Sequence, residues 1–248
     1  MKKSVYVLPS LFTLGNLSAG FFSIIFSFEH AFTKAAWAIL IAGAFDFLDG
    51  KVARMTKTTS QFGVEFDSIA DIVSSGVAPA VMIYILSLHR YPTWGKIICL
   101  VYLVAGALRL ARFNTNKIVE DPRYFRGLPL PAAAGVLASF VIVYNMFERE
   151  ITRKAIPILM NKMPLFYEMI PLGILLLSYL MISNIRYSSF KGVRLIRPKT
   201  IQNLIMIFVA LLLIWRFPEN MILIVFSAYL LSGILGLLLR FLKIRKIH

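Results

Sequence analysis

Long apolar stretches alternate with short polar connectors along the whole chain. Most of these stretches approach or reach the roughly 20 apolar residues that cross the hydrocarbon core of a bilayer as a helix. The connectors carry charged residues together with proline or glycine, which tend to end helices. The pattern predicts eight membrane-spanning helices, at residues 11–28, 34–50, 67–88, 96–113, 129–147, 164–184, 201–216 and 219–240.

The composition agrees with a membrane protein. Hydrophobic residues make up 58% of the 248 residues and the mean hydropathy is +0.75, whereas a soluble domain is about 45–50% apolar. The basic and apolar start of the chain lacks a convincing small-residue cleavage site, so we expect it to form the first span. Cys99 is the only cysteine, so the chain can form neither an intramolecular disulfide nor a cysteine metal cluster.

The distribution of basic residues predicts the orientation in the membrane. If the N-terminus is cytoplasmic, 19 of the 27 lysines and arginines fall in cytoplasmic segments, which places both termini inside. The net charge of +15 is therefore loop charge suited to anionic lipids, and we expect no nucleic-acid partner. A basic linker at 185–200 divides a predicted membrane core, residues 1–185, from residues 186–248, a linker and C-terminal helical hairpin.

Four aspartates lie near the second and third predicted spans, where a carboxylate is costly unless it is paired. Asp46 and Asp49 are three residues apart and Asp67 and Asp71 four apart, so on helices each pair shares a face. If the connection at 55–62 reverses the chain, the two pairs face each other. Such carboxylates repel one another, and all-oxygen ligation suits Mg²⁺ or Mn²⁺. For any single aspartate, a salt bridge with a nearby basic residue is the simpler interpretation.

The spacing Asp46-x2-Asp49-Gly50-x2-Ala53-Arg54-x8-Gly63-x3-Asp67-x3-Asp71 resembles the full signature of the CDP-alcohol phosphatidyltransferases, and the likeness extends over about the first 185 residues. It implies an all-α, polytopic membrane helix bundle with a six-helix core, to which about two transmembrane helices are added here. It also implies that the four aspartates hold two divalent cations, Mg²⁺ or Mn²⁺, and that Asp71 is the general base. Residues implied to accommodate the CDP-lipid are Gly50, Ala53, Arg54 and Gly63.

Further stretches, such as "GALRLARFN" and "FRGLPLPAAAG", resemble the serine-using, integral-membrane branch of this family in bacteria. Serine carries a carboxylate, which an arginine can bind through both oxygens. We therefore expect the acceptor to be bound by polar residues at the cytoplasmic ends of the fourth and fifth spans, namely Arg109, Arg112, Asn114 and Arg126. A glycerol phosphate acceptor would also favour cations, so charge alone does not separate the two.

The resemblance thus implies an enzyme of the bacterial cytoplasmic membrane that converts CDP-diacylglycerol and L-serine into phosphatidylserine and CMP, as a homodimer with a cytoplasmic active site. A sister enzyme acting on glycerol 3-phosphate, inositol phosphate or another alcohol is the first alternative. A carboxylate-dependent ion transporter is the second. Thr13 and Asn16, polar residues in the first span, are expected either to form hydrogen bonds between helices or to contact the nucleotide.

Overall fold

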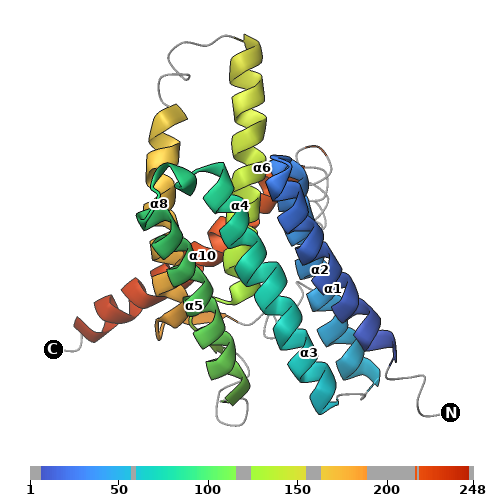
Figure 1. Ribbon diagram of the computed structural model, residues 1–248. Coiled ribbons are helices and arrows are strands. Elements are labelled where there is room, and N and C mark those ends of the chain that lie inside the picture. Colours follow the sequence, from blue (N-terminus) through green and yellow to red (C-terminus); the bar gives the residue numbers. More distant parts are fainter. Residues whose placement is uncertain are drawn as a thin grey trace.

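A computed structural model describes residues 7–56, 60–115, 124–154, 163–188, 216 and 218–245. Within these residues the chain forms a helical bundle with one small antiparallel sheet (Figure 1). The helices are α1 (Val7–Phe28), α2 (Phe32–Thr56), α3 (Gln61–Asp71), α4 (Ala78–Leu86), α5 (Trp94–Thr115), α6 (Leu130–Lys154), α8 (Met163–Ile182) and α10 (Pro218–Arg245). A π-helical turn (Ile72–Val77) joins α3 to α4, and a 3₁₀ turn (Leu88–Arg90) precedes α5. The strands are β1 (Tyr124–Arg126) and β2 (Arg186–Ser188).

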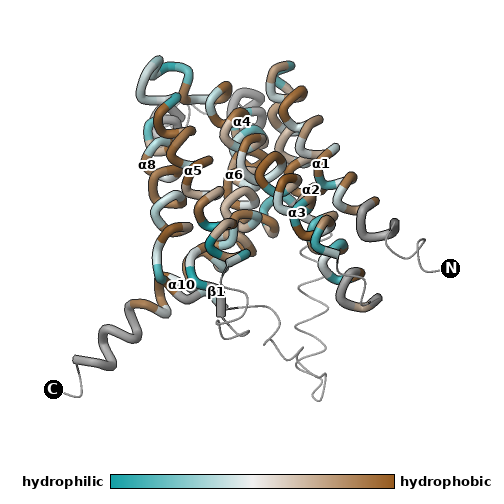
Figure 2. Tube along the Cα trace, turned by 60° about the horizontal axis from the view of Figure 1, so that its bottom comes forward, coloured by the Kyte–Doolittle hydropathy of each residue, from teal (hydrophilic) through white to brown (hydrophobic). Residues whose placement is uncertain are grey.

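The predicted polytopic helical bundle is confirmed. Five helical stretches are long and apolar enough to cross a membrane, namely Leu11–Phe28, Gln61–Leu86, Trp94–Thr115, Leu130–Glu148 and Glu219–Leu237. The second predicted span is α2, whose second half carries charged residues, and the sixth is α8. The seventh, 201–216, lies outside the described residues apart from Arg216. Figure 2 shows hydrophobic residues along the helices, with hydrophilic positions where α2 and α3 approach each other.

Helix α1 packs on α2 and on the α3–α4 segment through a stripe of small and polar residues. The buried positions on α1 are Thr13, Asn16, Gly20, Ser23 and Ser27, spaced alternately by three and four residues. The exposed large side chains of the helix are all apolar: Leu11, Leu14, Phe21, Phe22, Ile25 and Phe28. In a soluble protein the large apolar side chains would be buried and the polar ones exposed. The reverse arrangement on α1 is typical of membrane helices, where small residues let helices approach closely and apolar residues face lipid.

The π-helical turn follows directly after Asp71 and has an identifiable cause. Pro79 has no backbone N–H, so the carbonyl of Ser75 cannot receive the helical hydrogen bond that residue 79 would normally donate. The hydroxyl of the fully buried Tyr102 on α5 donates to that carbonyl instead, at 3.0 Å. The Ala78 N–H meanwhile reaches Val73 O, which widens the turn. Single π turns inside α-helices are frequently found at functional sites.

The small sheet pairs the segment just before α6 with the segment just after α8. Phe125 pairs with Tyr187 in register, and Gly127, just after β1, has φ +75 and donates from its N–H to Ile185 O at 2.8 Å. A side chain at Gly127 would collide with Met181 O, so only glycine fits there.

Helix α10 packs on this sheet and on α6. The fully buried Tyr187 of β2 packs against Tyr229 of α10 with ring centroids 5.6 Å apart, and Gly233 lets α10 approach its ring closely. Burial and the neighbouring Tyr229 raise the pKa of Tyr187 to about 12, so this phenol stays protonated at neutral pH.

The predicted division of the chain near residue 185, between a membrane core and a C-terminal part, stays a prediction.

Candidate functional site

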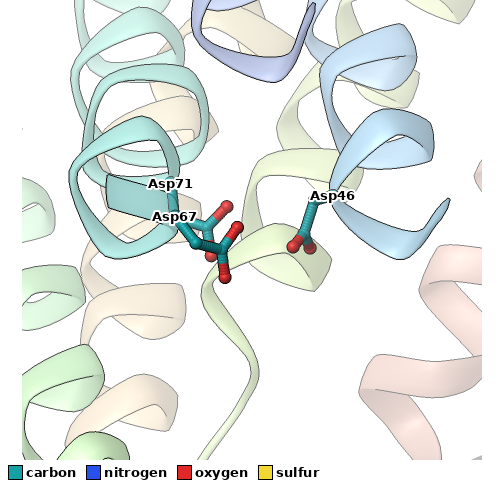
Figure 3. A group of neighbouring side chains, drawn as sticks. All are labelled: Asp46, Asp67 and Asp71. Atoms are coloured by element: carbon teal, nitrogen blue, oxygen red, sulfur yellow. The ribbon is translucent and has the colours of Figure 1, made fainter. Parts of the chain in front are cut away.

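Three of the four signature aspartates meet between α2 and α3. Figure 3 shows Asp67 and Asp71 pointing from α3 toward Asp46 on α2. One carboxylate oxygen from each of these residues lies within 4.8 Å of those of the other two. Asp71 is buried, with 7% of its surface exposed, whereas Asp46 and Asp67 are half-buried. Both neighbours interact with Asp71 by electrostatic repulsion, so the group has the charge and the spacing to share cations.

The fourth aspartate, Asp49, lies almost one turn further along α2 and is also buried, at 6% exposure. Its carboxylate accepts a hydrogen bond from the Thr13 hydroxyl of α1. Asn16, one turn further along α1, donates from Nδ2 to Oδ1 of Asp71 at 3.0 Å. Of the two alternatives for Thr13 and Asn16, the structure therefore has hydrogen bonds between helices, and the partners are signature carboxylates.

The positions assigned to the CDP-lipid flank the cluster along the chain. Gly50, Ala53 and Arg54 lie on the last turns of α2, and the side chains of Ala53 and Arg54 fall outside the described residues. Gly63 lies in the first turn of α3, where its N–H donates to the capping hydroxyl of Ser60 at 3.0 Å. Gly63 thus has a local role in starting α3, and its role toward a nucleotide stays a prediction.

Arg109 on α5, one of the four residues assigned to the acceptor, acts electrostatically on the acidic cluster. Its side chain is buried, with 8% exposed, and its guanidinium interacts electrostatically with Asp71. The guanidinium carbon also lies 5.8 Å from the centroid of the Phe113 ring, one turn further along the helix. A buried arginine at this place supplies a positive charge that acts on the Asp71 carboxylate.

The other three residues are engaged in different places. Asn114 donates to the Ser68 hydroxyl of α3 at 2.9 Å, so it joins the end of α5 to the helix of Asp67. Arg112 donates to Oδ1 of Asn184 at 2.6 Å, beyond the end of α8. Arg126 is exposed on β1, where it pairs with Arg186 across the sheet. The structure therefore brings Arg109 and Asn114 to α3 but directs Arg112 to the segment after α8.

The donor set fits a divalent cation. Mg²⁺ and Mn²⁺ bind through carboxylate oxygens and complete their coordination with water and substrate phosphates. Three carboxylates from two neighbouring helices supply such oxygens, with Asp46 on one side and Asp67 and Asp71 on the other. The site lies toward the end of the bundle where α2 ends and α3 begins, the same end at which α1 begins and α5 ends (Figure 1).

Comparison with known proteins gives a consistent result. The family model described as CDP-alcohol phosphatidyltransferase matches residues 6–171, which include all four aspartates, the helices from α1 through α6 and the first part of α8. The family as a whole is metal-dependent, in agreement with the acidic cluster.

Several relatives match over most of the chain. A Helicobacter pylori (strain ATCC 700392 / 26695) protein named CDP-diacylglycerol–serine O-phosphatidyltransferase is 34% identical over 240 residues, which cover 97% of this chain and 94% of that protein. A Bacillus subtilis (strain 168) protein of the same name is 33% identical over 186 residues, 74% of this chain and 91% of the relative. An archaetidylserine synthase from Methanothermobacter thermautotrophicus is 37% identical over 142 residues, 56% of this chain and 59% of the relative.

Proposed function

The chain belongs to the CDP-alcohol phosphatidyltransferase family, and on that premise we propose that it transfers the phosphatidyl group of CDP-diacylglycerol to the hydroxyl of L-serine. The products are phosphatidylserine and CMP. The relatives named above support serine as the acceptor. The observation that carries the proposal is the meeting of Asp46, Asp67 and Asp71, from two neighbouring helices, inside the region that matches the family.

The four aspartates would hold two divalent cations, Mg²⁺ or Mn²⁺, with Asp49 contributing from the turn after Asp46. Such cations, when bound, neutralise the pyrophosphate of the donor and the charge that develops on the leaving CMP. Gly50, Ala53, Arg54 and Gly63 would line the nucleotide, where small residues permit close approach of the cytidine and Arg54 offsets phosphate charge. The acyl chains of the donor stay in the bilayer beside the apolar faces of the helices.

The acceptor would approach from the side of α5. Arg109 would bind the serine carboxylate, with Arg112, Asn114 and Arg126 as further polar contacts at this end of the bundle. The oxygen of the serine hydroxyl would attack the β-phosphorus of the donor, and Asp71 would take the proton of that hydroxyl. The bond between that phosphorus and the bridging oxygen of the pyrophosphate breaks, and CMP departs with the oxygen. A metal-bound carboxylate is a weak base, so Asp71 must lie within hydrogen-bond reach of the hydroxyl.

The chain would work in the bacterial cytoplasmic membrane, with the site facing the cytoplasm. The basic residues support this orientation, since 19 of the 27 lie in segments on the same side as the aspartates. We also propose that two copies associate as a homodimer within the bilayer.

The acceptor is tested by incubating the purified full chain with CDP-diacylglycerol, Mn²⁺ and one alcohol at a time. We expect CMP release with L-serine but not with glycerol 3-phosphate, inositol phosphate or ethanolamine, and we expect EDTA to abolish it. Ethanolamine is the matched control, because it offers a hydroxyl and an amine without the carboxylate. Release with another alcohol instead of serine would identify a sister enzyme. No release with any alcohol would contradict phosphatidyl transfer altogether.

A further inference from the structure

The buried stripe on α1 contains two kinds of polar residue. Ser27 donates to Ser23 O of its own helix at 2.8 Å, a local bond that any membrane helix can make. Thr13 and Asn16 instead bond to carboxylates on other helices, although they lie on the same stripe and are equally buried, at 2% and 0% exposure. Thr13 and Asn16 therefore differ from Ser27 in their hydrogen-bond partners and not in their burial.

The two carboxylates held by α1 come from different members of the acidic site. Thr13 contacts Asp49 on α2, and Asn16 contacts Asp71 at the end of α3. These aspartates are 22 positions apart in the chain, and α2 and α3 are joined through a short connection. A single turn of α1, from Thr13 to Asn16, thus bonds to one carboxylate from each aspartate pair.

We propose that Thr13 and Asn16 are positioning residues of the metal site, and that α1 fixes the carboxylates of α2 and α3 relative to each other through them. This inference rests on the proposed role of the aspartates as metal ligands. Groups that orient a ligand carboxylate matter because a bound ion tolerates little change in the direction of its oxygens.

The close packing of α1 supports this role. Gly20 follows Asn16 by one turn on the stripe, and a Cβ at Gly20 would lie 2.7 Å from Cα of Ser74 in the π-helical turn. Helix α1 therefore approaches the backbone of the π-helical turn, three residues after Asp71, so closely that a side chain at position 20 would collide with it. A rigid contact there keeps the Asn16 amide in place with respect to the Asp71 carboxylate.

The Asn16 amide is committed to the carboxylate and not to helix packing in general. Its Nδ2 donates to Asp71, while its Oδ1 is buried and has no hydrogen-bond partner among the described residues. An asparagine that served only to join two helices would be expected to pair both ends of its amide, because an unpaired buried oxygen costs free energy. Asn16 thus donates to the Asp71 carboxylate although its own Oδ1 atom is buried without a partner among the described residues.

The test compares full-length variants in detergent by Mn²⁺ binding, measured from the electron paramagnetic resonance of free Mn²⁺, and by turnover. Thr13→Val keeps the shape and removes the hydroxyl, and Thr13→Ser restores it. Asn16→Leu removes the amide at similar size, with Asn16→Ala in reserve should the larger side chain prevent folding. Ser23→Ala and Ser27→Ala are matched controls, because they delete a buried hydroxyl from the same stripe without touching a carboxylate.

We expect Thr13→Val and Asn16→Leu each to weaken Mn²⁺ binding by about 10-fold or more, the usual effect of removing a group that orients a ligand. The turnover should fall in parallel with an unchanged KM for serine, and Thr13→Ser should restore both. Unchanged Mn²⁺ affinity in Thr13→Val and Asn16→Leu would overturn the inference, as would an equal loss in Ser27→Ala. If the unaltered protein bound no Mn²⁺, or Asp67→Asn had no effect on binding, the proposed function itself would fail.

Discussion

Asp71→Asn is expected to lower turnover by about 10³-fold or more, since it removes the proposed general base, a role that typically contributes 10²–10⁴-fold, together with a proposed metal ligand. Asparagine has the same shape and can still accept the hydrogen bond from Asn16, so the packing between α1 and α3 should survive. The substitution also removes electrostatic repulsion from Asp46 and Asp67. We therefore expect the thermal midpoint of the metal-free variant to be equal to or above that of the unaltered protein.

The matched control is Glu65→Gln, which makes the same chemical change on an exposed side chain of α3. It should leave turnover and thermal midpoint unchanged. Near-normal, metal-dependent CMP release by Asp71→Asn would show that the assigned base is wrong. A fall in activity accompanied by a lower thermal midpoint would instead indicate a folding defect.

Arg109→Lys is expected to raise the KM for serine by about 10- to 100-fold, which corresponds to the loss of one hydrogen bond between charged groups at about 1.5–3 kcal/mol. Lysine keeps the positive charge beside Asp71 but lacks the planar fork that binds both oxygens of a carboxylate. The KM for CDP-diacylglycerol should not change, because in the proposed site the aspartates and their cations hold the donor, and Arg109 does not. Steady-state kinetics with each substrate varied in turn measures both constants.

Two further variants on α5 sharpen this result. Lys96→Ala changes an exposed basic residue at the opposite end of the same helix and should leave both constants unchanged. Arg112→Ala should also raise the KM for serine, but less than Arg109→Lys, because the Arg112 guanidinium is bonded to Asn184 and not to the acidic helices. A serine KM that is unaffected by Arg109→Lys would remove Arg109 from the acceptor site.

The sequence predicted the bundle and the acidic cluster because both depend on local patterns. Apolar stretches of about 20 residues are expected to become helices in a bilayer, since a helix satisfies its backbone hydrogen bonds within the segment. Five of the predicted spans recur as helices that are long and apolar enough to cross a membrane. The spacing of Asp46, Asp67 and Asp71 places them on helix faces, and the short connection after α2 brings those faces together.

Other features depend on contacts that the local pattern does not contain. The π-helical turn arises from Pro79 together with a hydroxyl donated by Tyr102, which lies 27 residues from its partner Ser75. The polar stripe on α1 could be recognised in the sequence, but its partners are 36 and 55 residues away, so the bonds to Asp49 and Asp71 could not. The bond of Arg112 to Asn184 spans 72 residues and was missed for the same reason.

The most direct test of the account is anomalous diffraction from crystals of the protein grown with Mn²⁺ and CDP-diacylglycerol. The account predicts two manganese peaks between α2 and α3, within coordination distance of the carboxylates of Asp46, Asp49, Asp67 and Asp71 and of the donor pyrophosphate. Manganese bound elsewhere, or carboxylates of these helices turned away from a pyrophosphate that is held by arginines alone, would contradict it.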